Sequence, residues 1–314
     1  MILGTRLDDY VGRCFATITG ADEVNEPAVR HLLEAMEWDW PDAPVPLSTY
    51  LTFALPSYRN GDGTIPDRTL PPLPFHEVPA PGSRAIGTRI EVAAGDRPMR
   101  YGDRLRSEWF LQAVTPCRTR VGDGLYLDYE TRFRNQCAEL VAVERTRVLR
   151  FDPRELGEDA SGGALPIRGD DSEREPFTVD RPRAGTRLAE VTLPMSLQRL
   201  VMLASANRDF APIHHDPAAA AEIGASAPVV NTMFLLSFAE RLLVENGGPA
   251  ARAVRLGPLR LLRPTPSGGT VTARGTVREV VPVPGGFEVE ADVEILTGTA
   301  GVTVAGPGRM TVPR

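Results

Sequence analysis

The chain has 314 residues, 42% of them hydrophobic, and 35 basic against 41 acidic side chains give a formal net charge of −6. That length suits two domains of ordinary size, and the acidic balance argues against a nucleic-acid partner. No apolar run of about 18 residues predicts a membrane span, residues 1–10 lack a signal-peptide pattern, and three scattered cysteines fit a reducing compartment, so a cytoplasmic protein is expected.

The first part of the chain predicts two helices and then a run of strands. Residues 21–36 have a helical pattern with Leu32, Leu33 and Met36 on one face, and a second helical segment follows a proline-rich stretch. Residues 64–82 are rich in proline and predict an irregular loop. Alternating apolar and polar residues with turn formers between them then predict strands. These strands are expected at 89–105, 107–115, 124–133 and 139–151.

The middle of the chain predicts a connector between two domains. Residues 153–185 are polar, acidic and interrupted by glycine and proline, which is typical of a solvated linker. The predicted domains are therefore 1–152 and 186–314. In the second domain an apolar helix is followed by four strands. The strands are expected at 253–262, 270–281, 286–296 and 301–312.

One short loop in the second domain concentrates chemically useful residues. Asp209 and His214 are five residues apart, and Pro212 between them prevents a continuous helix. A short alanine-rich helix follows, with Asp216 as the predicted N-cap, proline at its first position and Gly224 at its end. A carboxylate and an imidazole on one loop could hold a water molecule and exchange protons with it.

A second, longer helix follows this loop after Pro228. The apolar run 229–243 predicts a buried helix, and Asn231 or Thr232 can cap its start. The first amide N–H groups of a helix have no partner within it, so they form a natural site for a developing negative charge. The spacing thus places a candidate acid–base pair just ahead of a candidate oxyanion site.

The two parts of the chain repeat one pattern of helix and strands. At a shift of 184 residues Ser48 aligns with Thr232 and Leu51 with Leu235, and at shifts of 166 and 162 the strands align as well. The helices that precede these segments, at 30–36 and 198–204, align at a shift of only 168 residues. The first part therefore lacks sixteen residues between its two helices, at the place where the second part has Asp209. This repeat predicts a tandem duplication with one candidate loop, in the second part.

The segment from Asp209 to His214 resembles the D-x-N-P-[LIV]-H signature of the MaoC-like, R-specific enoyl-CoA hydratases. That resemblance implies an α+β fold, a tandem (double) hotdog in which each half wraps an antiparallel sheet around a central helix. The first half resembles the N-terminal domain that accompanies MaoC-like domains. The chain departs from the family pattern in three places: Ala211 replaces the asparagine of the signature, Asn207-Arg208 replaces the usual Ser-Gly before it, and Asn231-Thr232 replaces the usual His-Gly at the helix start.

The resemblance also implies roles for residues of the second half. Asp209 and His214 correspond to the catalytic pair, and Asn231 and Thr232 to the helix start that binds the thioester oxygen. Contacts with the substrate are expected from Arg208, which could bind a coenzyme A phosphate or form a surface ion pair, and from Phe210 and Pro212. Neither a metal nor a cofactor is implied.

These inferences predict reversible dehydration of (R)-3-hydroxyacyl thioesters to trans-2-enoyl thioesters. The carrier is coenzyme A or an acyl carrier protein, and a homodimer or hetero-oligomer of double hotdogs is expected. Two alternatives stay open: a hotdog thioesterase, and a non-catalytic subunit that binds acyl thioesters. The first half is expected either to be a scaffold or to make room for a bulky acyl chain.

Overall fold

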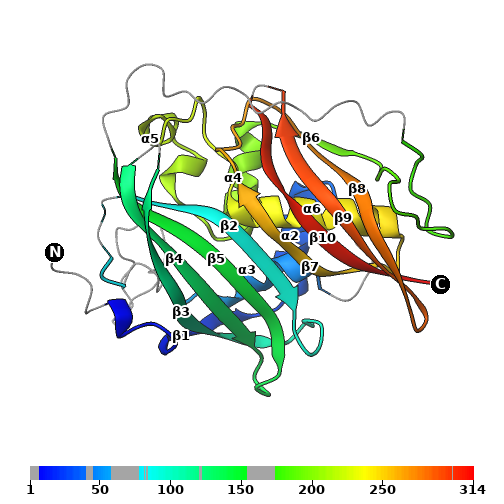
Figure 1. Cartoon of the computed structure of the whole chain (residues 1–314), viewed down its shortest axis with the longest axis horizontal. Coiled ribbons are helices and arrows are strands. Elements are labelled where there is room, and N and C mark those ends of the chain that lie inside the picture. Colours follow the sequence, from blue (N-terminus) through cyan, green and yellow to red (C-terminus); the bar gives the residue numbers. More distant parts are fainter. Residues whose placement is uncertain are drawn as a thin grey trace.

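A computed structural model describes residues 7–39, 45–57, 78–80, 82, 84–119, 122–153, 174–298 and 300–314. Ten strands of these residues form one curved sheet, with the helices on one side of it (Figure 1). The strands are β1 (Cys14–Glu23), β2 (Arg84–Ala94), β3 (Arg104–Arg118), β4 (Gly122–Arg134), β5 (Leu140–Pro153), β6 (Val191–Met195), β7 (Arg252–Leu261), β8 (Gly269–Val283), β9 (Gly286–Thr297) and β10 (Gly301–Pro313).

The strand order shows the duplication directly. The sheet runs β1-β3-β4-β5-β2-β7-β10-β9-β8-β6, so each half has the same order read from its outer edge. The halves meet where β2 pairs antiparallel with β7, for example Ile90 with Leu259 and Ala93 with Arg255. All neighbours in the sheet are antiparallel. The predicted tandem hotdog is therefore confirmed.

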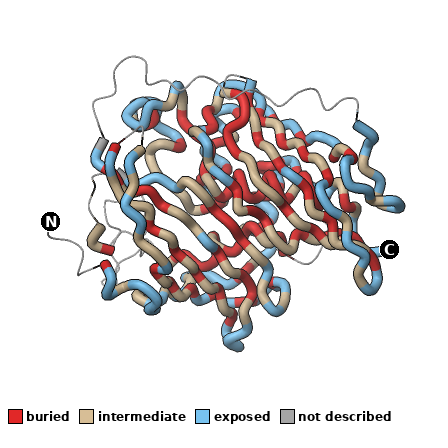
Figure 2. Tube along the Cα trace, in the orientation of Figure 1, coloured by how far each residue is buried: buried red, intermediate tan, exposed pale blue. Residues whose placement is uncertain are grey.

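Along the strands, buried residues alternate with half-buried and exposed ones (Figure 2). On β4, Leu127, Tyr129 and Phe133 are buried on the helix side. Between them Asp128 points to the other face, where its carboxylate accepts two hydrogen bonds of 2.7 Å from Arg147. Because side chains of a strand alternate between its faces, this pattern fixes which face of the sheet packs on the helices.

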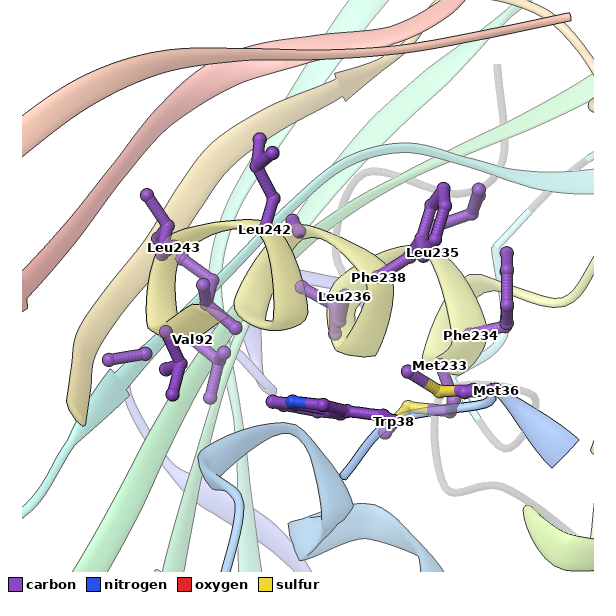
Figure 3. Packing of buried hydrophobic residues seen from close by; sticks show 14 of the residues in the cluster. Met36, Trp38, Val92, Met233, Phe234, Leu235, Leu236, Phe238, Leu242 and Leu243 are labelled. Carbon is purple, nitrogen blue, oxygen red and sulfur yellow. The ribbon is translucent and has the colours of Figure 1, made fainter. Parts of the chain in front are cut away.

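The central helix of the second half, α6 (Thr232–Gly247), is largely buried, with 12 of its 16 residues buried. Apolar side chains surround it, and their burial against β7–β10 holds the helix in place. Figure 3 shows Met36 and Trp38, from the end of the first-half helix α2 (Glu26–Ala35), on one side of α6 and Leu242 on the other. Material from the first half therefore completes the core around the second-half helix.

The corresponding helix of the first half is much shorter. It consists of a 3-10 turn, η1 (Leu47–Thr49), and α3 (Tyr50–Ala54), which has 5 residues against 16 in α6. Leu55 is already extended, with φ −77° and ψ 141°, because Pro56 disfavours the helical conformation of the residue before it. The halves thus share a sheet topology but differ in how far the central helix extends.

Most predicted strands and helices are confirmed, but the strand expected at 89–105 ends at Ala94, and β3 begins only at Arg104. β1 and β6 are additional strands at the two sheet edges. Residues 64–77 of the predicted loop and residues 154–173 of the predicted linker lie outside the described residues. The remaining end of that linker packs on the second half, where the Gly185 amide donates to the Val277 carbonyl of β8 at 2.8 Å. No helix of the described residues is long and apolar enough to cross a membrane.

Candidate active site

The end of helix α4 (Leu197–Ala206) sets the position of Asp209. The Arg208 amide donates to the Ser205 carbonyl at 3.1 Å, and the Asp209 amide donates to the Ala204 carbonyl at 2.8 Å. These two bonds close the helix as a Schellman motif, which requires a left-handed residue between them. Arg208 supplies it with φ 57°, where glycine is the usual choice. We call residues 207–214 the Asp–His loop.

The Asp–His loop brings its two titratable side chains into direct contact. Pro212 opens a 3-10 turn, η5 (Pro212–His214), that turns His214 back toward Asp209. His214 Nε2 lies 3.2 Å from Asp209 Oδ2, and His214 Nδ1 lies 2.7 Å from the Val229 carbonyl oxygen. His214 is buried, whereas the Asp209 side chain is 25% exposed. The Val229 carbonyl thus fixes the His214 ring, whereas the Asp209 carboxylate is partly accessible to solvent.

Both ring nitrogens of His214 face acceptors, which favours the protonated ring. Burial opposes that charge and is the largest single effect. The hydrogen bond and the negative charge of Asp209, together with the Val229 carbonyl, outweigh it, so the pKa of His214 is raised above 6.5. On the protonated ring, the Nε2–H therefore faces the Asp209 carboxylate across their 3.2 Å contact.

The start of α6 lies beside this pair. Asn231 caps the helix, because its Oδ1 accepts the Phe234 amide hydrogen at 2.8 Å. Thr232 is the first helical residue, so its amide N–H has no acceptor inside the helix. Thr232 and Met233 line the same cavity as Asp209 and His214. The start of α6 thus borders the Asp209–His214 pair in one cavity.

A buried amide connects these two parts. Asn207, the residue that ends α4, is 2% exposed, and its Nδ2 donates to Asn231 Oδ1 at 3.3 Å. Asn231 Oδ1 also accepts the Phe234 amide hydrogen, so this oxygen is fixed in place as an acceptor. Asn207 must therefore turn its Nδ2, which is a donor, toward Asn231. Asn207 Oδ1 and Asn231 Nδ2 remain buried without a partner among the described residues. The Asp–His loop and the helix start are therefore tied by one hydrogen bond.

The cavity at this site has a volume of about 360 Å³ and is lined by both halves of the chain. Asp209, His214 and Thr232 of the second half line one part of it. Much of its remaining wall comes from the segment around α3 and from β2 and β5 of the first half. The first-half lining residues are Leu51, Leu55, Ala85, Gly87, Arg89, Ile90, Glu144, Thr146 and Val148.

Arg208 joins the Asp–His loop to the first half. Its guanidinium donates to the Pro56 carbonyl at 2.9 Å and to the carbonyls of Thr52 and Leu55 at 3.4 Å. It also lies 3.5 Å from an Asp22 carboxylate oxygen, which is the ion pair that the sequence left as an alternative to phosphate binding. The side chain is 17% exposed and lines the cavity.

The other predicted site residues lie around the cavity. Phe210 is 39% exposed and Pro212 starts η5, and neither lines the cavity; Asn231 lies behind the helix start as its cap. His215 is exposed. Sequence reasoning expected a scaffold or room for an acyl chain from the first half but named none of its lining residues, and it gave Asn207 no role in the site. Contacts between the halves leave no local pattern in the sequence.

The first half has no comparable pair among its described residues. The chain from the end of α2 to η1 is short, and there Glu37 forms an ion pair with Arg199 of α4. The start of η1 is already occupied: Glu240 of α6 accepts the amide hydrogens of Leu47 and Ser48, both at 2.8 Å. Glu240 is 1% exposed. A carboxylate of the chain itself thus fills the position that is open at Thr232.

Comparison with known proteins places the second half in a family and relates the fold of the whole chain to solved structures. Residues 181–299 match the family model of the MaoC like domain. Among solved structures, a MaoC-like dehydratase covers 98% of this chain and 99% of its own, with 18% identity and a TM-score of 0.69. A MaoC domain protein dehydratase from Chloroflexus aurantiacus J-10-fl covers 96% of both chains, with 13% identity and a TM-score of 0.66. A MaoC-like dehydratase from Phytophthora capsici covers 98% of both, with 16% identity and a TM-score of 0.61. The search of curated proteins found no match.

The strand order and the central helices define a tandem hotdog protein, and its described residues contain one Asp–His loop. Residues 181–299 are a MaoC-like domain, and the whole chain has the fold of the MaoC-like dehydratases. The first half takes part in that fold although the family model does not extend to it.

Proposed function

We propose that this protein is a hydro-lyase that interconverts (R)-3-hydroxyacyl and trans-2-enoyl thioesters. The observation that carries the proposal is the Asp209–His214 contact of 3.2 Å in a cavity that also contains the start of α6. Acid, base and oxyanion donor are the groups that this reaction needs. The match of residues 181–299 to the MaoC like domain supports the same reaction class.

In the hydration direction the pair moves two protons. Asp209 accepts a proton from water as the water oxygen bonds to C3 of the enoyl group. The C2–C3 electron pair shifts toward the thioester, and the protonated His214 then donates its Nε2 proton to C2. The proton taken by Asp209 returns to His214 across their contact, so the pair ends in its starting state. Dehydration reverses each step with the same groups.

The thioester oxygen gains negative charge between these two proton transfers. In the proposed complex it lies at the Thr232 amide, where the helix start provides a fixed donor and a favourable dipole. The tie from Asn207 to Asn231 keeps this donor in register with the Asp–His loop. Neither proton transfer requires a metal or redox group, and all the groups used belong to the chain.

The position of Glu240 weakens the thioesterase alternative. A central-helix carboxylate would have to reach a water or the substrate, and Glu240 instead accepts two backbone amide hydrogens at 1% exposure. Glu240 is also the first acidic residue along α6. A non-catalytic binding subunit would need none of the proton-sharing geometry of the Asp–His loop.

Purified protein mixed with crotonyl-CoA and longer trans-2-enoyl-CoAs tests the proposal. Loss of the conjugated enoyl absorbance with formation of the (R)-3-hydroxyacyl product is the expected result. Release of free thiol would instead indicate a thioesterase. Binding without any turnover across the whole panel, on both coenzyme A and carrier-protein thioesters, would indicate a non-catalytic subunit.

A further inference from the structure

The wall that the first half gives to the cavity contains a buried carboxyl that the proposed hydration does not use. Glu144 lies on β5, is 6% exposed, and lines the cavity together with Asp209 and His214. Most of the wall around it is apolar, including Leu51, Ile90 and Val148. A carboxyl against a saturated hydrocarbon chain is unfavourable, because it loses water without gaining a new partner.

Two hydroxyl groups hold this carboxyl in place. The Thr146 hydroxyl donates to Glu144 Oε1 at 2.5 Å, and the Tyr50 hydroxyl donates to Oε2. Tyr50 is fully buried and packs its ring on Phe133, with centroids 4.6 Å apart. A carboxyl group has about four acceptor positions, so these two donors leave acceptor capacity on both oxygens.

The fold itself does not require this polar cluster. The registers of β5 against β4 and of β10 against β9 align Glu144 with Gly306 in the second half. In the central helices, Tyr50 aligns with Phe234, which is equally buried and stacks on Phe238. The second half therefore builds the same part of the hotdog without a carboxyl or a phenol. The first-half cluster is an addition on the side that faces the substrate cavity.

We propose that Glu144, supported by Thr146 and Tyr50, recognises a hydroxyl group on the acyl chain, so that the preferred substrate is a hydroxylated 2-enoyl thioester. This inference rests on the hydration function proposed above. A substrate hydroxyl donates to a free acceptor position of the carboxyl, whereas a plain alkyl chain leaves that position unmatched. Because Tyr50 and Thr146 stay bonded in both cases, the expected preference is moderate, about 10- to 100-fold in kcat/KM.

The test is a panel of trans-2-enoyl-CoAs of equal length, one plain and the others with a single hydroxyl moved along the chain beyond the enoyl group. Wild-type protein should have a higher kcat/KM for at least one hydroxylated member than for the plain one. Glu144→Leu should reduce the ratio of these two kcat/KM values to about one, because leucine cannot accept a hydrogen bond from the substrate hydroxyl. Glu144→Gln, which keeps the shape, should reduce it partly. Thr131→Val, on the neighbouring strand and outside the cavity lining, should keep the wild-type ratio.

The possible failures are distinguishable. If wild-type protein hydrates the plain chain as well as every hydroxylated one, the role of Glu144 is refuted while the hydratase function stands. A hydroxyl preference that survives unchanged in both Glu144 variants would refute the assignment to this residue. If no member of the panel is hydrated, with or without release of free thiol, the proposed function itself fails.

Discussion

Replacing Arg208 by alanine should loosen the junction between the Asp–His loop and the first half. The change removes a guanidinium that donates to the Pro56 carbonyl at 2.9 Å and more weakly to two other carbonyls of that segment. A hydrogen bond to a charged donor contributes about 1.5–3 kcal/mol, whereas the partner Asp22 is 62% exposed and adds little. We therefore expect the free energy of unfolding to fall by about 2–3 kcal/mol.

Glycine at the same position is the matched control. Arg208→Gly loses the same contacts but relieves the left-handed backbone, φ 57°, which costs a side-chain-bearing residue roughly 1 kcal/mol. Urea denaturation should thus rank the proteins as wild type, Arg208→Gly and Arg208→Ala in falling stability. Equal losses in the two variants would refute the argument from backbone strain. Wild-type stability in both would show that the guanidinium does not hold the halves together.

Three further predictions concern the groups around the site. Thr232→Pro should lower kcat much more than Thr232→Ala, because only proline removes the amide; equal losses in variants with unchanged crystal structures would point to the side chain instead. Glu240→Leu should cost roughly 1–3 kcal/mol of unfolding free energy for each of the two amides it strands, and Glu240→Gln less, as urea denaturation would show; unchanged stability would contradict the observed capping. The raised pKa of His214 means that the folded chain binds this proton more tightly than the unfolded one, so its contribution is complete below 6.5 and is lost as pH rises through the folded pKa. Unfolding measured from about pH 5.5 to 8.5 should show this loss in wild type and not in Asp209→Asn, and identical pH profiles would exclude the coupling.

The local features of the second half could be predicted because short sequence signals determine them. Asp216 and Pro217 start α5 (Pro217–Glu222), Asn231 caps α6, and Pro212 keeps the Asp–His loop out of a regular helix. Each of these depends on one backbone preference of one residue, so the sequence alone is sufficient. The doubled strand pattern likewise predicted the tandem sheet, since both halves bury the same alternating face.

The features that sequence reasoning missed depend on contacts between distant segments. Glu144 reads as an ordinary polar residue of an alternating strand until α3 places Tyr50 against it. Arg208 could be assigned to a phosphate or an ion pair, and only the position of Pro56 shows where its guanidinium lies. The edge strands β1 and β6 gain much of their stability from pairing with β3 and β8, which residue propensities do not encode.

The rate of trans-2-enoyl-CoA hydration in wild type, Asp209→Asn, His214→Ala and the double variant tests the proposed mechanism most directly. Each single change should lower kcat by roughly 10²–10⁴. The double variant should be little worse than the single ones, because the two side chains act as one proton-sharing unit. Circular dichroism and urea denaturation must show that the variants remain folded. Folded variants that hydrate the substrate at the wild-type rate would contradict the assignment of this pair as the acid and base.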